Sequence, residues 1–158
     1  MKTDTTKQAE MLLWRDNRKM GNFGCFEVSI GFNDDYRGCV ERVDFITYDT
    51  KGVVRCFEIK VSKSDLNSKA KKSFIGDFNY YVMPSELWES LQSDKDFMWH
   101  VRGLGVGVYS FTSRTLECVL KPKKKQVSMG LKVTVLESMV RSLNREVAKF
   151  YTDAPYWS

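Results

Sequence analysis

Two segments of alternating apolar and polar residues, joined by a short polar turn, constrain the fold of this chain more than any other feature. The segments are 40–48 and 53–61, and the turn is Asp49-Thr50-Lys51-Gly52. Such alternation is typical of strands, and a short turn with glycine typically joins two strands in a hairpin. We therefore expect two neighbouring antiparallel strands in the first half of the chain.

Helical and strand patterns alternate along the rest of the chain. Apolar spacing and end signals predict helices over 4–19, 62–75, 84–91 and 133–151. Alternation predicts further strands over 25–32, 79–83, 105–111 and 116–120. This order predicts a single domain, residues 1–158, of the α/β (α+β) class, with a mixed central sheet flanked by helices and a mostly antiparallel start.

Composition removes several classes of protein and site. The net charge of +5 is compatible with a nucleic-acid partner. No apolar run reaches the ~18 residues of a membrane span, and the N-terminus lacks the apolar core of a secretory signal, so we expect a cytoplasmic protein without a membrane partner. The one histidine, His100, and the lack of a C-x-x-C pair argue against zinc sites and two-histidine mechanisms.

Charged residues gather on the polar face of the predicted hairpin. In Phe57-Glu58-Ile59-Lys60-Val61 the apolar side chains point one way, so Glu58 and Lys60 point the other. Asp44, on the preceding strand, can lie beside them. Two carboxylates, with the Ile59 carbonyl as a further oxygen ligand, suit Mg²⁺ or Mn²⁺. A lysine beside such an ion can orient a water and offset charge on a phosphoryl group, so the set predicts phosphodiester hydrolysis.

Asp44 followed, after a hairpin, by Glu58-Ile59-Lys60 resembles the PD-(D/E)XK nuclease superfamily. The longer pattern of 42–44 and 58–66 resembles, more narrowly, MmcB-like DNA repair proteins and related phage-encoded proteins. The resemblance implies a restriction-endonuclease-like core and a Mg²⁺-dependent nuclease. It implies that Asp44 and Glu58 are metal ligands and that Lys60 is the catalytic lysine. Val43 stands where the motif has proline.

The superfamily commonly adds a glutamate from the first helix, and two residues compete for this catalytic role. Glu10 fits the family pattern, because it lies in the predicted first helix. Glu27 lies in the 25–32 strand, on the face opposite to the apolar residues Phe26, Val28, Ile30 and Phe32. The resemblance slightly favours Glu10 and strand parity favours Glu27, so both remain candidates.

Two groups of lysines are candidates for contacts with nucleic-acid phosphates. One group follows the Glu-x-Lys motif and the other follows the last predicted strand. The candidates are Lys63, Lys69, Lys71, Lys72, Lys123, Lys124 and Lys125. Phosphate contacts would make DNA binding weaken steeply with salt, whereas a solvated face is the alternative interpretation.

These patterns predict a metal-dependent nuclease that hydrolyses phosphodiester bonds in DNA, with a preference for DNA structure or ends. The alternative is a non-catalytic module on the same fold that binds nucleic acid or protein, such as a phage-encoded regulator of a host system, because a fold does not imply a function. A protein partner or a homodimer is compatible with both.

Overall fold

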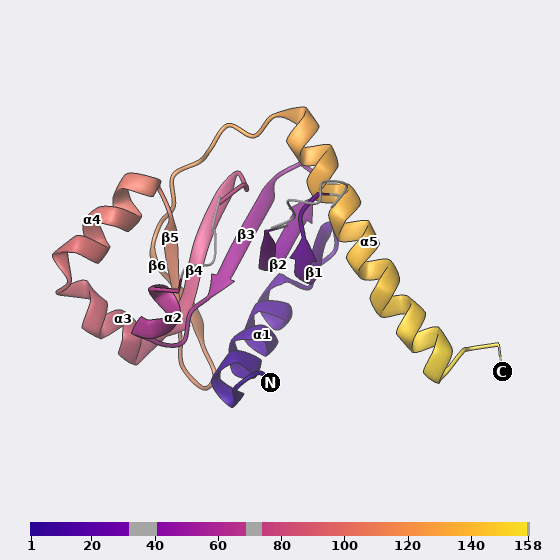
Figure 1. Ribbon diagram of the computed structural model, residues 1–158, viewed down its shortest axis with the longest axis horizontal. Coiled ribbons are helices and arrows are strands. Elements are labelled where there is room, and N and C mark those ends of the chain that lie inside the picture. The colour runs from indigo at the N-terminus through magenta and orange to yellow at the C-terminus, as the bar shows by residue number, and fades with distance from the viewer. Residues whose placement is uncertain (32–40, 69–73, 158) are drawn as a thin grey trace.

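The computed structural model describes residues 1–31, 41–68 and 74–157. Within these residues, strands form one mixed sheet in the order β1-β2-β3-β4-β5-β6 (Figure 1). The strands are β1 (Asn22–Ser29), β2 (Arg42–Asp49), β3 (Val54–Ile59), β4 (Phe78–Pro84), β5 (Gly107–Phe111) and β6 (Leu116–Leu120). The helices are α1 (Asp4–Asn17), α2 (Lys63–Leu66), α3 (Ser85–Gln92), α4 (Lys95–Leu104) and α5 (Met129–Asp153). The predicted class, a mixed sheet flanked by helices, is confirmed.

The sheet begins antiparallel and becomes parallel at its centre. β1 pairs with β2 and β2 with β3 in antiparallel fashion, as the hairpin predicts. β3 with β4 and β4 with β5 are parallel pairs, and β6 returns antiparallel to β5. Parallel neighbours require a crossover, which here contains α2 after β3 and both α3 and α4 after β4. The strand that carries Glu58 is therefore paired on both sides.

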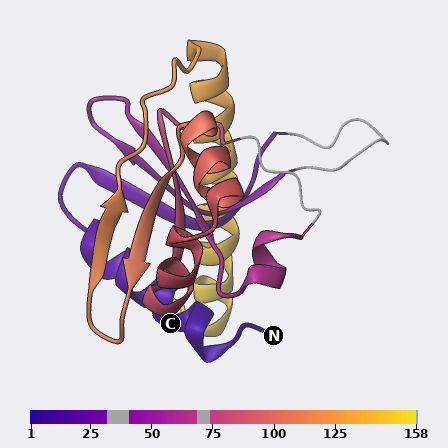
Figure 2. The ribbon, with the colours of Figure 1, turned by 90° about the vertical axis from the view of Figure 1, so that its left-hand side faces the viewer.

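Helices cover the two faces of the sheet. On one face, α1 packs Leu12 and Leu13 against the ring of Phe57. On the other face, α5 packs Met139 over Cys56, and α3 and α4 cover the end of the sheet formed by β4 and β5. Figure 2 shows α4 in front of α5. Because side chains alternate along a strand, Glu58 shares the face of Cys56 and points away from α1.

The alternation predicted for 25–32 is wrong at Glu27. Its φ is +53°, in the left-handed region that side chains with a Cβ rarely adopt. This conformation breaks the alternation of side chains, so residues on either side of Glu27 that were expected on one face of the sheet point to opposite faces. Phe26 consequently packs in the cluster under α1, whereas Val28 and Ile30 pack in the cluster under α5. Phe32, expected on the same face, lies outside the described residues.

Two helices differ from the sequence prediction. Of the helix expected over 62–75, the described residues contain the four-residue α2, and Asn67, Ser68, Phe74 and Ile75 are not helical. Apart from Leu66, the first part of this segment lacks large apolar residues that could hold a longer helix on the sheet. In contrast, α4 was not predicted, although Asp94 caps its start by accepting from the Phe97 N–H at 3.1 Å and Gly105 ends it at φ +70°.

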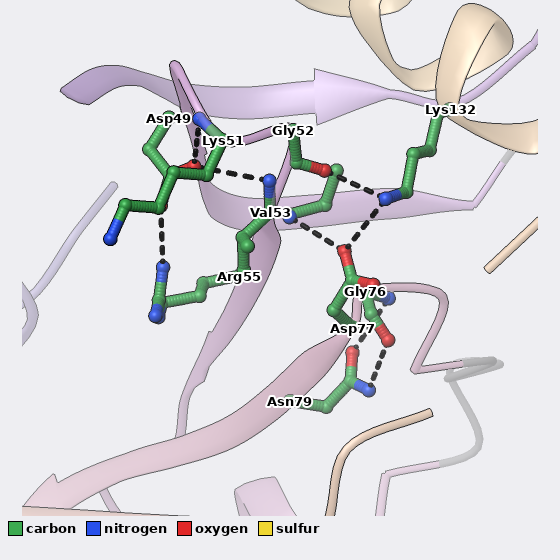
Figure 3. Close-up of polar contacts among 10 residues, drawn as sticks. Asp49, Lys51, Gly52, Val53, Arg55, Gly76, Asp77, Asn79 and Lys132 are labelled. Carbon is green, nitrogen blue, oxygen red and sulfur yellow. Dashed lines mark hydrogen bonds and ion pairs between the residues drawn. The ribbon is translucent and has the colours of Figure 1, made fainter. Parts of the chain in front are cut away.

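A buried carboxylate, that of Asp77, joins three elements at one end of the sheet. Asp77 Oδ2 accepts a hydrogen bond from the Val54 N–H at 2.8 Å, at the start of β3. The same oxygen lies 3.6 Å from Lys132 Nζ of α5, and Lys132 also donates to the Gly52 carbonyl at 2.8 Å (Figure 3). Asp77 directly precedes β4, so one side chain connects β3, β4 and α5.

We expect Asp77→Ala to lower the free energy of unfolding by about 2–4 kcal/mol, because it leaves a buried N–H without an acceptor and Lys132 without its counter-charge. Chemical denaturation followed by circular dichroism measures this. The matched control is Asp16→Ala, which removes an exposed carboxylate paired with Arg15 and should cost about 0–1 kcal/mol. Equal stability of the two variants would contradict the proposed link.

Candidate active site

Asp44 and Glu58 lie on neighbouring antiparallel strands, each one residue beyond the paired residues Phe45 and Phe57. Asp44 Oδ2 accepts a hydrogen bond from the Ile59 N–H at 2.8 Å, which fixes this carboxylate at the end of β3. Glu58 is only 2% exposed. The structure therefore places the Asp44 carboxylate on the backbone of the residue that follows Glu58.

Lys60 follows β3 directly and is also buried, at 6% exposed. Its N–H donates to the Val82 carbonyl at 2.9 Å, which continues the pairing with β4. Its Nζ donates to the Asp65 carbonyl at 3.2 Å and lies 3.9 Å from Asp65 Oδ1. The side chain shares the face of Glu58, two residues along the strand, and α2 supplies its negative partner.

Asp65 also belongs to this site, although the sequence analysis did not predict it as a site residue. Its Oδ2 accepts from the Val61 N–H at 3.1 Å, and its own N–H donates to Ser62 Oγ at 3.1 Å. These bonds hold the start of α2 against the end of β3, next to Lys60. The available signal was the Ser-x-x-Asp spacing of Ser62 and Asp65, which is similar to the capping box at helix starts.

Glu10 and Glu27, the two candidates for an additional carboxylate, contact the same cation. Lys2 Nζ lies 2.5 Å from Glu10 Oε1 and 3.2 Å from Glu27 Oε1. Burial works against the charge on Lys2, but the two carboxylates outweigh it and raise the pKa of Lys2. The structure therefore does not separate the two candidates, and it gives both of them an ion pair with Lys2.

Neither glutamate completes a three-ligand group with the central pair. Across residues 1–31, 41–68 and 74–157, no three His, Cys, Asp or Glu side chains are grouped so that they could hold a metal ion. The helix that carries Glu10 covers the face opposite to Glu58. Glu27 lies opposite Asp44 in the register of β1 and β2, but its carboxylate is turned to Lys2. The central pair still fits Mg²⁺, which needs only one or two carboxylates and keeps several waters.

Tyr81 adjoins Glu58 from the other side, through the parallel register of β3 and β4. Burial, and then the charge of Glu58, raise the pKa of the Tyr81 hydroxyl above its ordinary value. Tyr81 also lines a cleft of about 550 Å³ beside α2 and α4, together with Lys63, Phe97 and His100. Tyr81, the strand neighbour of Glu58, thus lines a cleft whose other wall is α4, a helix that the sequence analysis missed, whereas Asp44, Glu58 and Lys60 are not among the residues that line it.

The predicted phosphate-binding lysines differ in their surroundings. Lys63 lines the cleft, and Lys123, Lys124 and Lys125 are exposed. The ammonium of Lys125 is nevertheless held within the fold, because its Nζ donates to the Phe74 carbonyl and the Lys125 N–H donates to the Asp77 carbonyl, each at 2.7 Å. The remaining candidates, Lys69, Lys71 and Lys72, lie outside the described residues.

Comparison with known proteins supports the fold and leaves the activity open to experiment. No family model and no curated protein matches the chain. The chain is similar to a solved structure of a protein of unknown function from Silicibacter pomeroyi, with a TM-score of 0.70 and 14% identity, over 98% of this chain and 95% of that chain. At this identity the likeness shows the shared α+β fold alone.

Within the part of the chain that the structure describes, no helix is long and apolar enough to cross a membrane.

We expect Glu58→Gln to lower the pKa of Tyr81 toward its ordinary value, because the substitution removes the neighbouring negative charge and leaves the burial in place. Titration of protein labelled with ¹³C at the tyrosine ring, followed by NMR, measures this, and Tyr81→Phe assigns the resonance. Glu117→Gln, which changes an exposed glutamate of β6, is the control and should leave the titration unchanged. An unaltered pKa in Glu58→Gln would show that the two side chains do not interact.

Proposed function

We propose that the chain is a metal-dependent nuclease that hydrolyses phosphodiester bonds in DNA. The observation that carries the proposal is that the Asp44 carboxylate bonds to the N–H of Ile59, the residue between Glu58 and Lys60 on the neighbouring strand. Glu58 and Lys60 are both buried, and burying charged groups is costly unless they are paired. Charged residues kept in such surroundings are frequent at active sites, which favours a chemical role.

In this proposal Asp44 and Glu58 hold Mg²⁺ or Mn²⁺, with the Ile59 carbonyl as a further oxygen ligand. When bound, the ion polarises the phosphodiester and offsets its charge. Lys60 orients the attacking water and stabilises the negative charge that grows on the phosphoryl oxygens. Lys60 must then exchange its contact with Asp65 for one with the substrate, so Asp65 holds the ammonium in place until the substrate arrives.

The exposed lysines and the aromatic lining of the cleft support DNA as the substrate. Lys63 and the ring of Phe97 line the cleft that begins beside Tyr81, and cationic and aromatic side chains together suit unpaired nucleotides. Asp94 and Asp96 also line this cleft and would repel phosphates, so the phosphate contacts are assigned to Lys63 and to the exposed lysines outside it. We propose a preference for DNA structure or for ends, because stacking of bases on an aromatic side chain such as Phe97 does not read a base sequence.

A second candidate function is a non-catalytic module that binds nucleic acid or protein. The ion pairs of the candidate site favour this second function. Lys2 forms ion pairs with Glu10 and Glu27, and Asp65 forms an ion pair with Lys60. These contacts give the same charged residues a structural role that requires no metal and no reaction.

We expect cleavage of a panel of single-stranded, duplex and branched DNA in Mg²⁺ or Mn²⁺, and none in EDTA. Asp44→Asn, Glu58→Gln and Lys60→Met should each lower the rate about 100-fold or more, because each removes charge from the site. Mn²⁺ binding followed by electron paramagnetic resonance should weaken in Asp44→Asn and Glu58→Gln. Glu117→Gln is the matched control with wild-type rates.

Circular dichroism and thermal unfolding establish that each variant is folded before its rate is compared. Cleavage that survives in folded Glu58→Gln would overturn the nuclease assignment. Absence of cleavage on every substrate, with salt-sensitive DNA binding retained, would favour the non-catalytic module.

The basic residues give a separate prediction about binding. Reversing the charges of Lys69, Lys71 and Lys72 should weaken DNA binding and reduce the dependence of log Kd on log salt concentration by about 0.7–0.9 for each phosphate that these lysines no longer neutralise. Fluorescence anisotropy across a salt series measures both quantities. Lys125→Glu is unsuitable as a control because Lys125 is held within the fold, whereas Lys7→Glu, on α1, leaves these groups intact. Unchanged salt dependence in the triple variant would exclude these lysines from the DNA interface.

A further inference from the structure

The long helix α5 turns more of its large apolar residues to solvent than it buries against the sheet. The residues that it buries are Val135, Ser138, Met139 and Ser142. On the opposite side, an apolar stripe of Val133, Val140, Leu143, Val147 and Phe150 is 40–65% exposed. A surface helix normally packs its apolar side against its own core, so this arrangement leaves the apolar stripe without a partner within the described residues.

The spacing of the apolar stripe is that of a coiled coil. Together with half-buried Leu136, its members recur at intervals of three and four residues from Val133 to Phe150. In heptad terms Val133, Val140 and Val147 occupy the a positions, and Leu136, Leu143 and Phe150 the d positions. β-branched residues at a with Leu at d favour two parallel helices. The stripe runs ~27 Å along the helix at ~1.5 Å per residue.

The C-terminal part of α5 has little support from its own chain. Every residue from 143 to 154 is exposed, and Figure 1 shows this part of the helix extending away from the sheet toward the C-terminus. An isolated helix shorter than ~12–15 residues is marginal in water, so a helical end of this length needs packing to be stable. In its last turn, Tyr151 packs its ring against Tyr156 and Trp157, which follow the helix, with ring centroids 5.0–5.9 Å apart.

We propose that two copies of this chain associate through the apolar stripes of their α5 helices, side by side and parallel. The proposal goes beyond the nuclease function and does not depend on it. The stripe is self-complementary, because the same seam on both helices supplies the knobs and the holes of the contact.

The charges beside the stripe fit a second copy. In a parallel pair each g residue faces the e residue five positions on in the other helix. These pairs are Lys132 with Glu137, Met139 with Asn144, and Glu146 with Tyr151. No pair opposes like charges, and Lys132 is already held by Asp77 and the Gly52 carbonyl of its own chain. At the e and g positions beside the stripe, Glu137, Glu146 and Asp153 outnumber Lys132, whereas the basic residues Arg141, Arg145 and Lys149 are at other heptad positions. The edges of the stripe are therefore acidic, which argues against the phosphates of nucleic acid or anionic lipid as its occupant.

The first test is the mass of the protein in solution. Light scattering after gel filtration, from micromolar to hundreds of micromolar chain, should give twice the chain mass of 18.4 kDa. The double variant Val140→Lys, Val147→Lys should be monomeric at concentrations where the wild type is a dimer, because it places like charges in the seam. Trp99→Lys, which changes an exposed aromatic residue of α4 away from the stripe, is the matched control and should remain dimeric.

Circular dichroism establishes that the double variant is folded, which is expected because both valines are exposed. A wild-type monomer throughout the range, or a dimer that the double variant does not weaken, would overturn the proposal. A monomer that binds vesicles of anionic phospholipid through the stripe would also overturn it, since the occupant would then be a membrane.

A disulfide tests the parallel arrangement. Val133→Cys, at one end of the stripe, in a chain in which Cys39 and Cys118 are replaced by serine, places the same a position of the two helices together if they are parallel and ~26 Å apart along the helix if they are antiparallel. Oxidation should then link most chains into covalent dimers, and Thr134→Cys, off the seam, should not. A noncovalent dimer of Val133→Cys that fails to crosslink would overturn the parallel pairing.

Discussion

The buried carboxylate of Asp77 helps to fix the register of the parallel strands β3 and β4, and the candidate site depends on this register. A hairpin turn fixes the register of β2 and β3, but β3 and β4 are joined by a crossover, which leaves their register to tertiary contacts. Asp77 precedes β4 and accepts from the N–H of Val54, at the start of β3. That register in turn places Tyr81 beside Glu58 and gives the Lys60 N–H its acceptor in Val82.

The parts of the site that follow from local geometry could be predicted from the sequence. A four-residue turn and strand alternation bring Asp44 to the strand beside Glu58, and the structure has this arrangement. The contacts made by residues far apart in the chain could not be predicted. Lys2 reaches Glu27 only because α1 packs beside β1, and the left-handed backbone of Glu27 has no signature in a run of alternating residues.

The helices show the same division between local pattern and tertiary context. The start and end of α4 carry recognisable signals in Asp94 and Gly105, so this helix could have been predicted from the sequence. The spacing in α5 correctly predicted a helix with an apolar stripe. Periodicity gives the position of a stripe around a helix, but it does not say what the stripe contacts. Here the contact between α5 and β1 uses small residues such as Ser138 and Ser142, which a hydrophobic pattern does not mark.

The charges of the candidate site are compensated from within the chain, which bears on how the site could act. Asp44 accepts a hydrogen bond from a backbone N–H, and Lys60 forms an ion pair with Asp65. Glu10 and Glu27 both form ion pairs with Lys2. Such pairing offsets the cost of removing charges from water. It also means that any ligand must compete with the ion pair that it replaces. A phosphate must bind Lys60 more favourably than Asp65 does, and a cation near Glu27 must compete with Lys2. The contacts that stabilise the folded site therefore also select its ligands. A divalent cation carries twice the charge of the Lys2 ammonium, whereas a phosphodiester carries the same single negative charge as the Asp65 carboxylate and must gain from further contacts, such as those with a bound cation.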